Sequence, residues 1–323
     1  MRSTRAASAE ETTLVFATTL PPNAHLSVEF FRPWTQRVNE EGQGVIKVDV
    51  ADGSDLADHL NYYNRVLADV VQLAWGLQSY SGGKFPRSAV AGLPVIADKA
   101  EHAAVALLRL YESGALDAEY DEIVPIMLTA HSHTGIHLSR PLRSPDDLGG
   151  IRVIVPSKIT SKVVSMLGAT PVSIPLSEMY EAIQRGTVDG AVVGWAAFQP
   201  FKLAEVTTYH IDTELGASPG MVFMSKKKYE ALPVAARRII DANAGEAESR
   251  RFGAFWDEAK ALGRKETVAS PDKHTVVDLS PAAAEKWRQK ITPAIDDWAR
   301  STPDGEKTLQ DFRAILAQVK AGA

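Results

Sequence analysis

Hydrophobic and polar positions follow two different periods along the chain, and the changes between them mark the predicted elements. Short apolar runs predict strands at residues 14–17, 45–50, 70–74, 123–129 and 221–225. Apolar residues at helical spacing predict helices at 26–39, 58–68, 101–116 and, as one long helix, 233–262. From residue 226 the chain is predicted to be helical almost to its end, with breaks around 270–272 and 301–305. Strands that alternate with helices predict an α/β fold.

One stretch, Gly168–Trp195, has the pattern of a complete β-α-β unit. Residues 171–174 form its first strand, an amphipathic helix follows, and residues 191–193 form a second, buried strand. Ligands of open α/β sheets lie beyond the carboxyl ends of the strands. The segments that follow the two strands, Pro175-Leu176 and Gly194-Trp195, are therefore predicted to meet a ligand.

Composition limits the class of protein. With 323 residues, 45% of them hydrophobic and 23% charged, the chain is long enough for two domains. A net charge of −5 and the lack of a large basic cluster argue against nucleic acid as a partner. There is no cysteine, which excludes disulfides and thiolate chemistry, and no apolar run approaches the roughly 20 residues that span a bilayer. No cofactor motif is present.

Two ordered segments resemble a known family. SPDDLGGIRVIVP (144–156) and GATPVSIPLSEMYEAIQRGTVDG (168–190) are similar to "spaDLkGlkiRvp" and "Ga.pv.lp.sEvY.alq.G.vDG" in the substrate-binding proteins of TRAP transporters, the DctP-like family. The segment from Phe85 to Pro94 resembles that family's "fP…v.eLPf". The second of these motifs is the most specific because it is long and its residues are in order.

The resemblance implies a two-lobed, periplasmic-binding-protein-like fold with a ligand cleft between the lobes and a long helix along both. It implies lobe I at 14–131 plus 219–258 and lobe II at 132–218 plus 259–323, after a disordered lead-in at 1–13. The expected protein is a periplasmic monomer that is not an enzyme. It captures a small solute by hinge closure and delivers it to the membrane subunits of a TRAP transporter. Residues 1–13 lack the apolar region of a secretory signal.

The family's carboxylate clamp is altered in this sequence. In many members the Arg of "kiRvp" pairs with the ligand carboxylate, a task that suits the planar guanidinium. Here Ile154 occupies that position and Arg152 lies two residues earlier on the same strand face. Either Arg152 reaches the cleft or the clamp is missing. As an alternative, Arg152 is a solvated strand residue.

Aromatic side chains and one histidine are the other candidates for the ligand site. Trp75 and Trp195 follow predicted strands, Phe198 comes shortly after, and His133 is the nearest donor to a second Arg position of the family. Stacked rings suit an aromatic, zwitterionic or amine-bearing ligand as well as a carboxylate. The resemblance adds Thr19, His25, Ser157 and Ser218 as further ligand-binding residues.

The segment HSHTGIH (131–137) leaves two alternatives open. His131 and His133 share one side of an extended segment and would supply two corners of a zinc site, but no further ligand has a conventional spacing. A hydrolase or isomerase on the same fold would need such a constellation, and no G-x-S-x-G or phosphate loop is present. No catalytic and no metal-binding residue is therefore assigned. The binding component of an ATP-driven importer is the third possibility.

Overall fold

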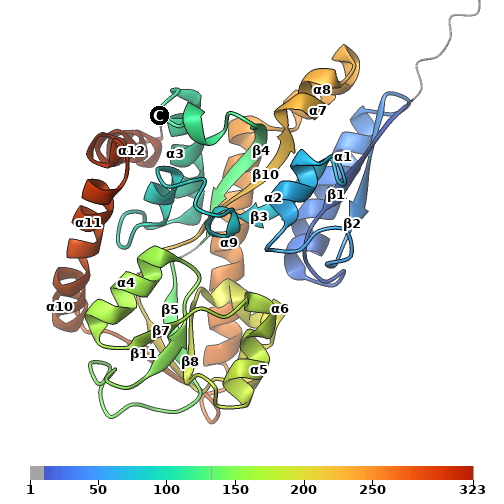
Figure 1. Ribbon diagram of the computed structural model, residues 1–323. Coiled ribbons are helices and arrows are strands. Elements are labelled where there is room, and N and C mark those ends of the chain that lie inside the picture. Colours follow the sequence, from blue (N-terminus) through green and yellow to red (C-terminus); the bar gives the residue numbers. More distant parts are fainter. Residues whose placement is uncertain (1–10, 132, 323) are drawn as a thin grey trace, which may run out of the picture. The chain divides into compact units, whose positions relative to one another are not determined.

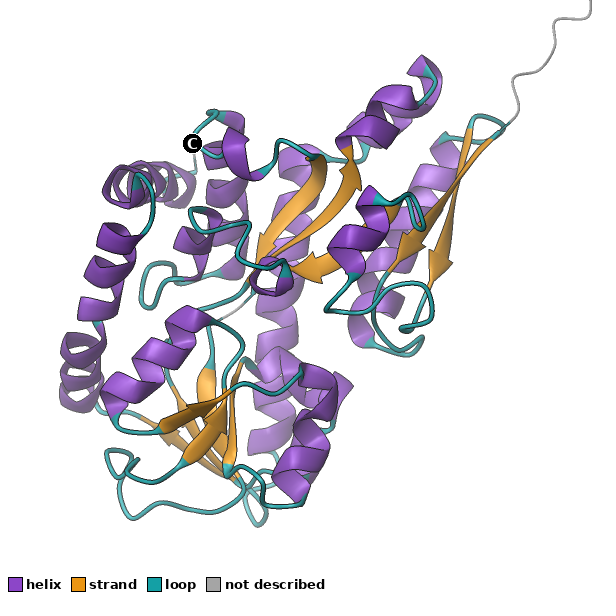
Figure 2. Ribbon diagram, in the orientation of Figure 1, coloured by secondary structure: helices purple, strands orange, loops and turns teal. Residues whose placement is uncertain are grey.

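The computed structural model describes residues 11–131 and 133–322, and it confirms the predicted α/β class. Figure 1 traces the chain, and Figure 2 shows helices packed around two sheets. The strands are β1 (Thr12–Ala17), β2 (Ile46–Ala51), β3 (Leu73–Leu77), β4 (Ile123–Ala130), β5 (Gly135–Leu138), β6 (Arg152–Ile154), β7 (Thr170–Val172), β8 (Gly190–Val193), β9 (Tyr209–Asp212), β10 (Pro219–Ser225) and β11 (Thr275–Asp278).

Most residues in the second half of the chain are in α-helices. They are α1 (Arg32–Glu41), α2 (Tyr62–Leu67), α3 (Ala100–Glu112), α4 (Lys158–Leu167), α5 (Met179–Gln184), α6 (Phe198–Phe201), α7 (Lys226–Ala231), α8 (Val234–Ala242), α9 (Gly245–Val268), α10 (Pro281–Ile291), α11 (Pro293–Ser301) and α12 (Gly305–Lys320). A π-helical turn, Ser27–Phe31, leads into α1. Short 3-10 turns begin at Gln78, Ser88, Asp117, Leu176, Trp195 and Leu203.

The first sheet has five strands in the order β2-β1-β3-β10-β4. Strand β1 is parallel to β2 along its whole length, from Thr12 opposite Ile46 to Ala17 opposite Ala51. Leu14 and Phe16 of β1 are fully buried, and Phe16 meets Trp34 of α1 edge-on at a centroid distance of 5.7 Å. The apolar runs that predict these strands therefore reflect burial in the sheet.

The second sheet has six strands in the order β11-β9-β5-β8-β6-β7. Strand β5 is antiparallel to both β8 and β9, whereas β6 is parallel to β7 and β8. Successive residues of β6 point to opposite faces. Val153 joins a core with α4 and α10, and Ile154 joins a second core with α5 and α6.

The structure corrects two predictions in the C-terminal half. The long helix predicted at 233–262 is two helices, α8 and α9, separated at residues 243–244, and Gly245, the first residue of α9, has a φ of +76°. The region predicted to be helical from residue 226 also contains a strand, β11, which pairs with β9. A four-residue edge strand lacks a pattern long enough to distinguish it from a break between helices.

The described chain divides into two compact units. The first comprises the residues up to Gly76 with Tyr120–Ile126 and Val222–Gly245, and the second comprises Leu77–Glu119, Met127–Met221 and Glu246–Ala323. This is a different division from that into lobes, whose boundaries stay a prediction. The lead-in expected at 1–13 lies mostly outside the described residues, and β1 begins at Thr12.

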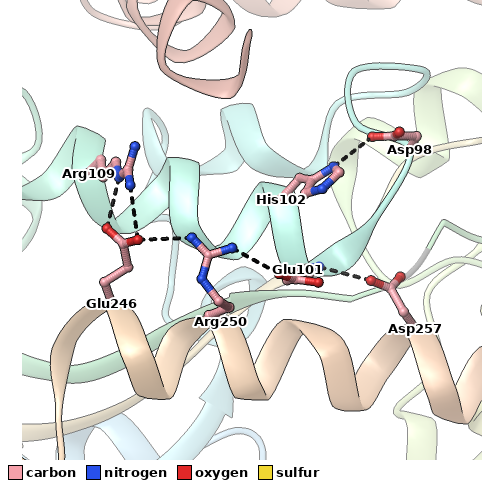
Figure 3. Close-up of polar contacts among 7 residues, drawn as sticks. All are labelled: Asp98, Glu101, His102, Arg109, Glu246, Arg250 and Asp257. Atoms are coloured by element: carbon pink, nitrogen blue, oxygen red, sulfur yellow. Dashed lines mark hydrogen bonds and ion pairs between the residues drawn. The ribbon is translucent and has the colours of Figure 1, made fainter. Parts of the chain in front are cut away.

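Within the second unit, α9 is joined to α3 by polar side chains (Figure 3). Asp257 caps α3 by accepting hydrogen bonds from the backbone N–H groups of Ala100 (2.9 Å) and Glu101 (3.1 Å). A ladder of ion pairs runs beside this cap, from Arg109 through Glu246 and Arg250 to Glu101. The two helices also approach closely, because a Cβ at Gly253 would lie 2.4 Å from the Cα of Glu101.

Candidate ligand-binding site

The second unit contains a cavity of about 350 Å³ that two of the predicted site residues line. Ser157 lies at the start of α4 and Ser218 just before β10. The wall is largely apolar and comes from Phe85, Pro86, Ile159, Pro219, Ala294 and Trp298. The volume falls within the range of small-molecule pockets, roughly 300–1,000 Å³.

The first turn of α4 faces this cavity through Ser157, Lys158 and Ile159. Ser157 and Thr160 form a capping box: the Thr160 N–H donates to the Ser157 hydroxyl at 3.2 Å, and the Ser157 N–H donates to the Thr160 hydroxyl at 3.0 Å. The remaining first-turn N–H groups carry the positive end of the helix dipole. Lys158 and Lys162 also line the cavity, and Lys162 pairs there with Asp297. With the α4 N-terminus and Lys158, this part of the cavity is suited to an anion.

Ser218, which lines the cavity, is hydrogen-bonded to His131. The Nδ1–H of His131 donates to the Ser218 carbonyl oxygen at 2.7 Å, and the His131 ring lies on Trp256 of α9 at 4.0 Å between centroids. Burial lowers the pKa of His131 to about 4, so the ring is neutral at pH 7. The Ser218 hydroxyl is buried and has no hydrogen-bond partner within the described residues.

His133, predicted as a donor to a ligand carboxylate, is buried in the second unit. Its Nε2 lies against the carbonyl oxygen of Ala97, so Nε2 carries the proton. Burial lowers the pKa of His133 and favours the neutral ring. A neutral ring that donates through Nε2 has an acceptor at Nδ1, and this atom has no hydrogen-bond partner among residues 11–131 and 133–322. His133 is thus better suited to accept a hydroxyl hydrogen than to bind a carboxylate.

In the first unit, the structure brings Thr19 together with Trp75. The Thr19 hydroxyl lies 3.5 Å from the Trp75 carbonyl oxygen and 3.5 Å from Nδ1 of His59, whose ring meets Trp75 edge-on. Thr19 has a φ of +58°, which is unusual for a β-branched residue. Strained backbone of this kind occurs most often at functional sites. His25 is half-buried in the same unit.

Trp195 and Phe198 are buried in the second unit, with ring centroids 4.8 Å apart. The Trp195 indole N–H donates to Asp212 at 3.0 Å, and Asp212 in turn accepts a hydrogen bond from Arg264 of α9 at 2.7 Å. The backbone of Trp195 lies against α9, because a Cβ at Gly263 would be 2.3 Å from the Trp195 carbonyl oxygen. These contacts hold Trp195 in one orientation.

Arg152 lies at the start of β6 with about half of its side chain exposed. Its guanidinium donates to the Gly186 carbonyl oxygen at 2.9 Å and pairs with Asp189 at 3.5 Å. Asp189 also accepts a hydrogen bond from the Arg152 backbone N–H. These contacts match the alternative in which Arg152 is a surface strand residue, while Ile154 is fully buried.

The cavity also contains residues that the sequence analysis missed. Lys158 directly follows Ser157, a predicted site residue, so its position in the sequence could have identified it. Trp298 of α11 lies 140 residues after Lys158, and no motif marks it. Its indole N–H donates to the Pro86 carbonyl oxygen at 3.2 Å, which joins α11 to the cavity wall.

No group of three or more histidine or acidic side chains in residues 11–131 and 133–322 is placed to hold a metal ion. Over the same residues, every helix is too short or too polar to cross a membrane.

Comparison with known proteins identifies relatives along almost the whole chain. TsaT of Comamonas testosteroni, described as an outer membrane transporter protein, is 25% identical over 97% of this chain and 94% of its own length. The C4-dicarboxylate-binding periplasmic protein DctP of Rhodobacter capsulatus is 27% identical over 55% of this chain and 53% of its own.

Solved structures show the same fold. A TRAP solute-binding protein from a marine metagenome, specific for aromatic acids and crystallised with 3-hydroxybenzoate, is 26% identical with a TM-score of 0.90, over 96% of this chain and 99% of its own. A TRAP solute-binding protein from Rhodoferax ferrireducens, with copurified benzoate, is 27% identical with a TM-score of 0.89, over 97% and 100%. The two-lobed α/β fold class and the resemblance to TRAP solute-binding proteins are thereby confirmed.

Members of this family are periplasmic receptors and not enzymes, and they work with membrane components of a TRAP transporter. The comparisons do not favour the hydrolase, isomerase or ATP-driven importer. A family model for bacterial extracellular solute-binding proteins, family 7 (DctP), matches residues 16–301. The chain therefore belongs to the DctP family of extracellular solute-binding proteins and binds a small solute for a TRAP-type transporter.

Proposed function

We propose that the solute is a small aromatic carboxylate. The similarity of this chain to two receptors of aromatic acids, each above 25% identity and aligned over nearly the full length, supports this ligand class. The sequence analysis allows a carboxylate, an aromatic ligand or a zwitterionic or amine-bearing one. An aromatic acid combines the first two properties and suits the rings that the sequence places after the strands.

The cavity at α4 supports the same class. A benzene ring fits the apolar wall formed by Phe85, Ile159 and Trp298, and a carboxylate fits the end with Lys158 and the α4 N-terminus. Because Ile154 replaces the family's arginine, Lys158 and the α4 N-terminus are the proposed partners of the carboxylate, whereas Lys162, which also lines the cavity, pairs with Asp297. This is the observation on which the assignment to the cavity depends.

Two of the other predicted residues, Ser157 and Ser218, supply hydroxyl groups to the cavity. His133 is proposed to accept a hydrogen bond from a ring hydroxyl. The other predicted residues do not line this cavity and stay proposed ligand-binding residues, namely Trp75, Thr19 and His25 of the first unit and Arg152, Trp195 and Phe198 of the second. We further propose that the protein works as a periplasmic monomer without catalytic activity, and that closure of the lobes traps the solute.

Isothermal titration calorimetry with benzoate and 3-hydroxybenzoate tests the ligand class. Benzyl alcohol, which lacks the carboxylate, and succinate, which lacks the ring, serve as comparators. We expect a Kd of about 1 μM for an aromatic acid, equivalent to roughly 8 kcal/mol, and far weaker binding of both comparators. Tight binding of succinate without binding of benzoate would contradict the aromatic assignment and leave the family assignment intact.

Variants of the cavity test its location. Lys158→Gln is expected to weaken benzoate binding about tenfold by removing a charge beside the carboxylate. Ala89→Phe fills part of the cavity and is expected to weaken binding more. Lys307→Gln on α12, an exposed lysine paired with Asp311, is the matched control and should bind normally. Normal affinity in both cavity variants would place the ligand elsewhere.

A further inference from the structure

Three buried histidines form a hydrogen-bonded chain across the second sheet. His137 is on β5, His210 is on the neighbouring β9, and His274 precedes β11. Nδ1 of His137 lies 3.1 Å from Nδ1 of His210, and Nε2 of His210 lies 3.1 Å from Nδ1 of His274. At the inner end, Nε2 of His137 lies 3.1 Å from the carbonyl oxygen of Val193.

These contacts determine where the protons lie when the rings are neutral. The Val193 carbonyl oxygen is an acceptor, so Nε2 of His137 carries a hydrogen and Nδ1 accepts. Nδ1 of His210 must then donate to His137, which leaves Nε2 of His210 as the acceptor for Nδ1–H of His274. One arrangement of three protons on three rings therefore satisfies every contact in the chain.

An added proton disrupts this arrangement. A hydrogen on Nδ1 of His137 would face the Nδ1–H of His210, and a hydrogen on Nε2 of His210 would face the Nδ1–H of His274, each across 3.1 Å. Nε2 of His274 is the ring nitrogen outside these contacts. Placing a proton there keeps the hydrogen bonds but puts a charge on a largely buried ring, next in sequence to Lys273.

The charged side chains nearest the three histidines already form contacts with other residues. Asp212, at the end of β9, attracts a proton toward His137, but its carboxylate binds the Trp195 indole and Arg264. Arg264 of α9 also pairs with Asp278 of β11. The Thr207 backbone hydrogen-bonds His274 and favours its charged form, whereas Lys273 opposes it. Among the described residues, no carboxylate is hydrogen-bonded to any of the three rings.

The rings of His137 and His210 pack against the side chains of Trp195 and Phe198. The ring centroid of His137 is 4.6 Å from that of Trp195 and 4.7 Å from that of Phe198, and the ring of His210 is 5.2 Å from Trp195. A change in the histidines therefore acts on the packing of both aromatic residues.

We propose that the hydrogen-bonded histidines His137, His210 and His274 are an acid-sensitive connection within the second sheet, which holds β5, β9 and the turn before β11 together while His137 and His210 are neutral. Protonation of His137 or His210 in acid breaks the hydrogen bonds between the rings and loosens the sheet with the aromatic residues packed on it. The assignment concerns the fold and is independent of the ligand class.

The expected titration agrees with the geometry. Burial lowers the pKa of His137 to about 4 and, together with the other two rings, lowers the pKa of His210 further; burial also lowers that of His274. In the unfolded chain a histidine has a pKa of about 6.5, so the unfolded state binds more protons as the pH falls below that value. The free energy of unfolding should therefore decrease as the pH falls from about 6.5 toward about 4.

Imidazole ¹⁵N chemical shifts of the intact protein test the proton positions. At pH 7.5, we expect His137 as the Nε2–H tautomer and both His210 and His274 as Nδ1–H tautomers. His137 and His210 should stay neutral down to the pH at which the protein unfolds. Titration of either ring near pH 6.5 while the fold stays intact would overturn the proposal.

A variant pair tests whether the rings act together. The dependence of the unfolding constant on pH gives the number of protons taken up on unfolding. His131 is not one of the three connected histidines, but its pKa is also lowered to about 4. His131→Gln should therefore reduce the uptake on unfolding by about one proton. His210→Gln should reduce it by more than one, because its two neighbours lose their shared contacts. If His210→Gln reduces the uptake by one proton or fewer, the three histidines titrate independently and the proposal is refuted. If His210→Gln does not fold, the ¹⁵N shifts decide.

Discussion

The two halves of α9 are attached to the rest of the second unit in different ways. The first part of α9 contacts α3 through the ion-pair ladder, whose side chains are partly exposed (Figure 3). It also contacts α3 through Asp257, which binds backbone N–H groups. The second half meets Trp195 through Gly263, Arg264 and Asp212, above the histidine chain. In both halves a glycine allows close backbone contact. Close packing is therefore common to the two attachments, whereas their polar groups should respond differently to salt and acid.

The largest effect is expected from the two glycines. In Gly253→Ala the new Cβ would lie 2.4 Å from the Glu101 Cα, and in Gly263→Ala it would lie 2.3 Å from the Trp195 carbonyl oxygen, so α9 must shift. We expect each to lower the free energy of unfolding by about 3 kcal/mol in denaturant titrations. Gly149→Ala, a surface position with open space around it, is the matched control. A small effect of one glycine alone would show that only one half of α9 is tightly packed.

The next effect is expected at Asp212. Asp212→Ala leaves the buried Trp195 indole N–H without its acceptor, at a cost of about 2 kcal/mol. Asp278→Ala removes only the exposed partner of Arg264 and should cost less than about 1 kcal/mol. Chemical unfolding of both variants gives the difference. Equal losses would mean that Arg264, and not the indole, accounts for the contribution of Asp212.

A smaller effect is expected at the cap of α3. Asp257→Asn replaces two charge-assisted acceptors by a neutral amide that has one oxygen, so one of the two backbone N–H groups loses its partner. We expect a loss of about 1 kcal/mol, measured as a lower midpoint of thermal unfolding. Unchanged stability would mean that water replaces the carboxylate at this helix end.

The smallest effect is expected in the ladder itself. Glu246→Gln should cost less than about 1 kcal/mol, because Arg109 and Arg250 are partly exposed, and 1 M salt should remove the difference. The hydrogen bond from Arg109 lowers the pKa of Glu246, so its contribution is present above the unfolded value of 4.5 and is lost as the pH falls through the folded value. Wild type and variant should therefore converge as the pH falls below 4.5 and through the lowered pKa of Glu246. The loss of stability at the three histidines has the same sign but begins at a higher pH, near 6.5.

The parts of the fold that the sequence predicts are those with local causes. The β-α-β stretch was recognised because its helix buries Met179 and Ile183 at helical spacing and because Gly190 begins a strand that is buried throughout. Strand β11 was missed because its partner, β9, lies more than 60 residues earlier and the pairing alone makes it a strand.

The candidate site could be predicted only in part for the same reason. Trp195 was identified from its place after a strand, but its partners Asp212 and His137 come from other strands and depend on the register of the sheet. The contact of Arg152 with Gly186 likewise joins β6 to the turn after α5, which lie far apart in the sequence. Histidine spacing in HSHTGIH suggested a shared role, yet His131, His133 and His137 contact three different partners.

The backbone of Thr19 has a consequence for how this chain would respond to selection. A glycine accepts a φ of +58° without steric cost, so Thr19→Gly should relieve strain at the end of β1. Ranking variants only by how well they fold would therefore discard the threonine and, with it, the hydroxyl beside Trp75. Because Thr19 is one of the proposed ligand-binding residues, screens for thermal tolerance in this protein should be paired with a solute-uptake assay.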